Sequence, residues 1–256
     1  MRKVIALIVT FTLCFLMCTF AFASDSPLAE LYFYNHGELG GLKTLNTTTC
    51  AANTEGAIDN AGYNCVWYTN VPAGPSSSGS VIRTLDDDAI FFISGHAGNG
   101  RVYCVDNNGN ITIISANAVY DNNAVYSLEY NFENTTDQLK NLRIAYWMGC
   151  NTYGTNDTYG SLNDKSTTLG IDCNITHANK TWPTYSNYFL YCFAFYGDQG
   201  QTVSTAITNA KAWCYSYYGT YAGSGNEADK TFSSCRIRGT TGYSSVTFEP
   251  AGYGTY

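Results

Sequence analysis

The sequence is poor in charged residues and contains no run of lysine or arginine. Charged residues make up 13% of its 256 residues, with 13 Lys and Arg against 20 Asp and Glu and a net charge of −7. Binding to nucleic acid or to an anionic membrane surface needs clustered basic side chains. We therefore expect neither nucleic acid nor, once the leader described below is removed, a membrane as a partner.

Several motifs of well-defined chemistry are also missing. There is no C-x-x-C of zinc ribbons or thioredoxin-like sites, and the three histidines form no H-E-x-x-H. No G-x-S-x-G elbow is present for a serine hydrolase. We therefore predict neither a metal nor a cofactor. Internal repeats are absent too, and the one Pro/Gly/Ser-rich stretch (71–79) is too short for a domain boundary.

The first 23 residues have the three parts of a secretory signal peptide. Arg2 and Lys3 precede a long apolar run, which ends in an A-x-A cleavage site at Ala23. An uncleaved anchor is the alternative, because the run is nearly long enough to span a bilayer. We expect cleavage near Ala23 and a secreted or cell-surface chain, 24–256, that folds as a single domain. Its 11 basic and 20 acidic residues give a net charge of −9.

Eight cysteines remain after the leader, at positions 50, 65, 104, 150, 173, 192, 214 and 235. In an oxidising compartment, an even number suggests up to four disulfides. If one of these cysteines is a nucleophile, seven remain, and at least one more thiol is then unpaired.

Apolar runs alternate with helix-like segments along the chain. The runs over 89–94 and 142–148 are continuous, as buried parallel strands require. Strands that alternate with helices predict an α/β fold with a mostly parallel sheet covered on both faces. Further strands are expected at 30–35, 66–69 and 232–238, a hairpin at 101–105 and 111–114 around D-N-N-G-N, and helices at 53–62, 162–169, 185–196 and 202–217.

His96 and Cys150 each follow one of the two apolar runs, and each stands directly after a glycine. In an open α/β sheet, functional residues lie beyond the carboxyl ends of the strands. If the two strands are neighbours, the imidazole lies beside the thiol, as a nucleophile and its base require. We interpret the pair as a catalytic dyad. The N–H groups of Cys150 and of Ala97 or Gly98 are candidates for an oxyanion hole.

The blocks S-G-H-x-G (94–98) and G-C-N-T (149–152) resemble those of the caspase-like (clan CD) cysteine peptidases, most closely the CHAT-type bacterial members. The segments that follow keep the order of that family, at 169–172, 189–196 and 200–210. The resemblance implies a caspase-like α/β/α sandwich with a β-hairpin between the catalytic strands. It also implies an endopeptidase that hydrolyses peptide bonds through a thioester acyl-enzyme. The commonest family pattern has Gly directly after the histidine, where this chain has Ala97.

Three further residues are weaker candidates for contacts with a peptide or protein substrate. His36 follows the first predicted strand and could reach the same edge of the sheet; an ordinary loop histidine is the alternative. Asp172 takes a position where related peptidases often supply a pocket residue, and its carboxylate would favour a basic P1 side chain. A solvated or capping aspartate is the alternative there. Tyr153 could form a pocket wall.

A non-catalytic secreted binding protein on the same fold is the second hypothesis. The even number of cysteines would suit a disulfide at Cys150, and the 22 tyrosines are residues common at recognition surfaces. The state of the Cys150 thiol separates the two hypotheses. For the peptidase, we expect a monomer that acts on a peptide or protein substrate.

Overall fold

The computed structural model describes residues 26–42, 44–73, 81, 88–98, 101–115, 118–121, 124–127, 142–150, 152, 167–171, 184–238 and 245–250. The predicted signal peptide lies outside these ranges. None of the helices within them combines the length and the apolar character that crossing a membrane requires.

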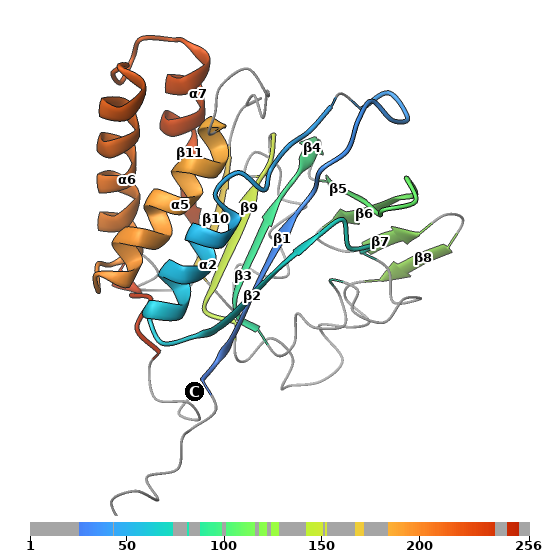
Figure 1. Ribbon diagram of the computed structural model, residues 1–256, viewed down its shortest axis with the longest axis horizontal. Coiled ribbons are helices and arrows are strands. Elements are labelled where there is room, and N and C mark those ends of the chain that lie inside the picture. Colours follow the sequence, from blue (N-terminus) through green and yellow to red (C-terminus); the bar gives the residue numbers. More distant parts are fainter. Residues whose placement is uncertain are drawn as a thin grey trace, which may run out of the picture.

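A six-stranded sheet in the order β11-β10-β9-β3-β1-β2 forms the centre of the fold (Figure 1). All neighbouring strands are parallel except β10 and β11, which are antiparallel. Every residue of β3 and β9 is buried, as their continuous apolar sequences predict. The strands are β1 (Leu28–Phe33), β2 (Asn64–Thr69), β3 (Asp88–Ser94), β9 (Ile144–Met148), β10 (Thr167–Ile171) and β11 (Cys235–Arg238).

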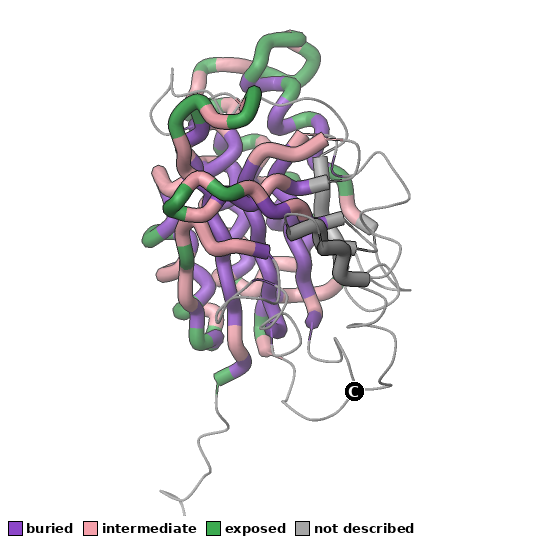
Figure 2. Tube along the Cα trace, turned by 90° about the vertical axis from the view of Figure 1, so that its right-hand side faces the viewer, coloured by how far each residue is buried: buried purple, intermediate pink, exposed green. Residues whose placement is uncertain are grey.

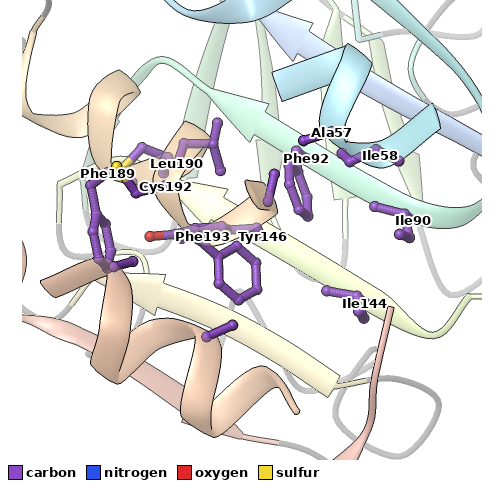
Figure 3. Packing of buried hydrophobic residues seen from close by; sticks show 14 of the residues in the cluster. Ala57, Ile58, Ile90, Phe92, Ile144, Tyr146, Phe189, Leu190, Cys192 and Phe193 are labelled. Atoms are coloured by element: carbon purple, nitrogen blue, oxygen red, sulfur yellow. The ribbon is translucent and has the colours of Figure 1, made fainter. Parts of the chain in front are cut away.

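The described helices gather on one face of this sheet (Figure 1). They are α2 (Ala51–Asn60), α5 (Tyr185–Asp198), α6 (Val203–Tyr218) and α7 (Glu227–Ser233). Figure 3 shows Phe193 of α5 beside Phe92 and Tyr146 of the sheet, with ring centroids 6.0 and 5.6 Å apart. Burying one such ring stabilises a fold by about 1.5–3 kcal/mol, so these contacts fix α5 on the sheet.

A second, antiparallel sheet packs on the opposite face. It consists of β4 (His96–Gly98), β5 (Arg101–Val105), β6 (Ile111–Ser115), β7 (Ala118–Asp121) and β8 (Ala124–Ser127), in that order. Val102 and Ile114 of this sheet join Phe91, Ile93 and Trp147 of the central sheet in one buried cluster. Figure 2 shows the resulting buried centre, and exposed residues lie both in loops and on the helices α2, α6 and α7.

The predicted hairpin is therefore confirmed, but it is part of a larger sheet than the sequence predicted. Its turn follows from Asp106, whose carboxylate accepts the N–H groups of Asn108 and Asn110, both at 2.8 Å. Gly109 has a φ of 83°, a conformation that favours glycine. The short strands β4, β7 and β8 show little hydrophobic pattern in their own sequences. Pairing with neighbouring strands determines where they form.

Two predicted elements differ in the structure. The helix predicted over 162–169 is wrong at its C-terminal end, where β10 begins at Thr167 and contains Gly170. β-Branched Thr167 and Thr168 fit a strand that pairs with β9 on one side and β11 on the other. The strand predicted over 232–238 begins only at Cys235, because α7 takes up the preceding residues.

The predicted helix over 202–217 is confirmed almost to the residue. Thr202 caps α6 by accepting the N–H of Thr205 at 3.3 Å, and Gly219 ends it with a left-handed φ of 64°. The helix predicted over 185–196 is also present, although α5 continues through Gly197.

Candidate active site

The parallel pairing of β3 with β9 sets where the two predicted catalytic residues leave the sheet. Ser94 pairs with Met148, and the N–H of Gly95 donates to the Met148 carbonyl at 3.2 Å. His96 and Cys150 each stand two residues beyond this last pair. The strand adjacency on which the predicted dyad depends is therefore confirmed, and both residues leave the sheet at one edge.

The two turns that follow β3 and β9 are in close contact. A Cβ atom built on Gly149 would lie 2.5 Å from the Cβ atom of Ala97 and 3.0 Å from the Gly95 carbonyl oxygen. Only glycine allows this approach, because Cβ atoms are essentially never found under 3.0 Å from another heavy atom. His96 and Cys150, each next to one of these residues, are both half-buried and so retain some access to solvent.

Thr152 fixes the turn that carries Cys150. Its hydroxyl is buried and lies 2.7 Å from the Trp147 carbonyl oxygen and 3.0 Å from that of Gly149. The hydroxyl has one hydrogen, so the two acceptors share it. The sequence reasoning did not assign this role, although Thr152 belongs to the G-C-N-T block.

The end of β3 is tied to the first turn of α5. The Ser94 hydroxyl donates to Oδ1 of Asn187 at 3.2 Å, and both side chains are buried. The N-terminus of α5 therefore lies at the edge of the sheet where β3 ends (Figure 1). A helix N-terminus carries a partial positive charge, which stabilises anions nearby. Sequence reasoning missed this contact, which depends on how α5 packs.

His36 lies beside His96, with ring centroids 5.3 Å apart and ring planes inclined by 42°. Its Nδ1 lies 2.6 Å from the Gly37 carbonyl, which accepts only if Nδ1 carries the proton. Nε2 of His36 is buried and has no hydrogen-bond partner among the described residues. His36 reaches this edge of the sheet as the sequence predicts; its contact with substrate stays a prediction.

The remaining predicted residues are only partly described. Tyr153 and Asp172 lie outside the described ranges. Ala97 and Gly98 belong to β4 and pair with Val102 and Arg101 of β5. The segment that begins at His96 is thus a short strand, because β5 supplies its backbone partners. Its part in an oxyanion hole stays a prediction.

The cysteines are distributed through the core rather than around Cys150. No two of the seven described cysteines form a disulfide with each other, and Cys173 lies outside the described ranges. A binding protein with a disulfide at Cys150 is therefore not favoured. Burial raises the pKa of the Cys50 and Cys104 thiols to about 12. Among the described residues, no three His, Cys, Asp or Glu side chains are arranged to hold a metal ion.

The fold is that of the caspases, an α/β architecture with a mostly parallel central sheet and flanking helices. Caspase-1 from Spodoptera frugiperda is similar with a TM-score of 0.53 and 11% identity, over 86% of this chain and 91% of that one. A structure of pro-sf-caspase-1 is similar with a TM-score of 0.51 and 9% identity, over 86% and 94%. No family model matches the sequence, and no curated protein does. At this identity the likeness defines the fold alone.

Proposed function

We propose that the chain is a cysteine endopeptidase in which Cys150 is the nucleophile and His96 the general acid and base. The observation that carries the proposal is the β3–β9 pairing, which leaves both residues two positions beyond Ser94 and Met148 at one edge of the sheet. The strand order places β3 next to β9, so the residues that follow these strands lie at one edge of the sheet. A caspase fold is consistent with this chemistry.

The reaction proceeds in two halves. His96 takes the thiol proton, and the Cys150 sulfur attacks the peptide carbonyl carbon to form a tetrahedral oxyanion. The carbonyl re-forms, the C–N bond breaks, and His96 gives the proton to the departing amine, which leaves a thioester on Cys150. Water, deprotonated by His96, then attacks the thioester and releases the carboxylic acid and the thiol.

Two features of the site favour these steps. The glycine at 149 lets the backbone beside Cys150 approach the turn that carries His96. Backbone N–H groups of Cys150 and of Ala97 or Gly98 would stabilise the oxyanion, a contribution of roughly 3–4 kcal/mol per donor. The N-terminus of α5, tied to Ser94 through Asn187, adds a partial positive charge at the same edge, which favours a thiolate.

The proposal includes export, a monomeric state and a CHAT-type pattern. The leader that ends at Ala23 supports export, and the ordered segments at 169–172, 189–196 and 200–210 support the CHAT-type resemblance. Mass spectrometry of the protein recovered from the medium of expressing cells measures its N-terminus, which we expect near Ser24. Light scattering measures the oligomeric state.

Cleavage of a peptide library tests the activity, in the presence and absence of reductant. Cys150→Ala is expected to abolish cleavage, and His96→Gln to reduce it by at least a hundredfold, with unchanged circular dichroism. Cys50→Ser is the matched control: Cys50 occupies the N-cap of α2, where serine is favoured, and it makes no side-chain capping bond. Normal turnover by folded Cys150→Ala would refute the proposal.

A further inference from the structure

The loop after β1 projects from the candidate site as a small hairpin. His36, whose ring lies beside that of His96, exchanges two backbone hydrogen bonds with Leu45, at 3.1 and 2.9 Å. Leu39 and Leu42 exchange two more, at 3.1 and 2.7 Å. The described residues of this loop, 36–42 and 44–45, therefore form a hairpin whose base adjoins His96.

The base of this hairpin is anchored to the residues that directly follow β1. The Asn35 side chain accepts the N–H of Thr47 at 2.7 Å and donates to the Thr48 hydroxyl at 3.0 Å, while its backbone N–H donates to Oδ1 of Asn70 at 2.8 Å. The Thr47 hydroxyl donates to the Tyr34 carbonyl at 3.0 Å. These bonds fix the hairpin relative to the sheet.

The tip of the hairpin rests on the turn between β5 and β6. A Cβ atom on Gly109 would lie 3.6 Å from the Leu39 methyl groups, and one on Gly40 would lie 3.0 Å from Cδ1 of Ile111. The hairpin is therefore held at two places, at its tip by packing on the β5–β6 hairpin and at its base by hydrogen bonds.

The same tip forms an open hollow of about 360 Å³, lined by Glu38, Leu39, Gly40, Gly41 and Leu42. Glu38 is exposed, and its carboxylate forms no hydrogen bond or ion pair with another described residue. Among the described residues of the lining, Glu38 is the one that is charged, and the others are leucine or glycine.

We propose that this hollow is a subsite for a lysine or arginine side chain of the peptide substrate. Such a side chain pairs an apolar stem with a cationic head, and the hollow pairs two leucines with one carboxylate. The net charge of −7 also favours the approach of basic peptides. This inference rests on the proposed peptidase function.

The hollow lies within reach of a substrate bound at the dyad. Glu38 is two residues from His36, a span of at most roughly 7 Å, and the His36 ring lies 5.3 Å from that of His96. An extended peptide advances about 3.3 Å per residue. A side chain two to four residues from the scissile bond can therefore reach Glu38.

Matched peptides that carry lysine or its uncharged isostere norleucine at each position near the cleaved bond test the subsite. We expect kcat/KM to favour lysine about two- to fivefold at one position, as an exposed ion pair allows. Glu38→Gln should remove this preference, Glu38→Lys should reverse it, and high salt should weaken it. Glu227→Gln, an exposed acid in the first turn of α7, should leave it unchanged.

Binding of the same fluorescent peptides to the Cys150→Ala protein measures the subsite without turnover. Lysine peptides should bind more tightly than norleucine peptides only when Glu38 is present. Cleavage or binding in which Glu38→Gln retains the full preference would overturn the subsite and leave the peptidase intact. Absence of Cys150-dependent cleavage would instead refute the peptidase, and the binding comparison would still decide the subsite.

Discussion

Gly149 and Ala97 approach so closely that a Cβ atom on Gly149 would lie 2.5 Å from that of Ala97. Each residue adjoins one of the predicted catalytic residues, Cys150 and His96. The contact therefore sets the spacing of the two turns, and it can be altered without touching either reactive side chain.

Gly149→Ala should separate the two turns, because the added methyl group cannot be accommodated without a backbone shift. We expect a loss of about 1–3 kcal/mol in the free energy of unfolding, as overpacking typically costs. Peptide cleavage should fall by more than tenfold. Urea denaturation and kcat/KM measure the two effects.

Ala97→Gly provides the matched control for this substitution. In the Gly149→Ala background it removes one of the two clashing atoms, so stability and activity should partly recover. Recovery should be incomplete, because the Gly95 carbonyl oxygen remains 3.0 Å from the new methyl group. Full activity of Gly149→Ala alone would show that the contact does not set the site.

Thr152→Val should lower kcat with little change in KM, because it removes the hydroxyl that binds the Trp147 and Gly149 carbonyls and so loosens the turn that carries Cys150. Leaving buried acceptors without a donor costs about 1–3 kcal/mol of stability. Thr152→Ser keeps the hydroxyl and should retain most of the activity. Equal behaviour of the valine and serine variants in steady-state kinetics would contradict this role.

Asp229 should make the stability depend on pH in the acid range. Its buried carboxylate accepts the N–H groups of Gly225 at 2.7 Å and Gly223 at 3.1 Å and the hydroxyl of Tyr215 at 2.8 Å. The Gly225 N–H in particular, together with the Tyr215 hydroxyl, holds the pKa of Asp229 below its ordinary value of 3.8. The stabilisation is therefore complete well above pH 3.8 and is lost as the pH falls through the folded-state pKa.

Asp229→Asn should therefore lower the unfolding free energy by roughly 1.5–3 kcal/mol at pH 7, where it replaces a hydrogen-bonded carboxylate. The difference from the wild type should shrink below pH 3.8. Thermal unfolding from pH 7 down to pH 2.5 measures both. A difference that stays constant over this range would show that the charge of Asp229 contributes nothing.

The elements that the sequence predicts well are those whose own residues determine them. β3 and β9 are continuous apolar runs, and Thr202 and Gly219 supply the cap and the stop of α6. Because β3 and β9 are adjacent and parallel, His96 and Cys150, which follow them, lie at the same edge of the sheet.

The features that the sequence did not predict depend on contacts between distant segments. β10 is a five-residue strand whose partners on both sides determine it, and α7 has only seven residues. The buried hydroxyl of Thr152 and the bond from Ser94 to Asn187 require a turn and a helix already in place. The path of the hairpin that carries Glu38 is likewise set by its packing on β5 and β6.

Cys150 should be the cysteine that reacts with iodoacetamide in the native protein at pH 8. Thiolate is the reactive form, and burial raises the pKa of Cys50 and Cys104 to about 12, which leaves roughly one thiolate in ten thousand at that pH. Burial raises the pKa of Cys65 and Cys214 as well.

Cys150 is instead half-buried beside the turn of His96. Among the described cysteines, peptide mapping by mass spectrometry should therefore find one rapid adduct, which His96→Gln slows and Cys150→Ala removes. In urea the buried cysteines should react as well, which distinguishes protected thiols from disulfides. Labelling of Cys50 or Cys104 as fast as Cys150 in the folded protein, or a Cys150 that stays unreactive until a reductant is added, would contradict the nucleophile assignment.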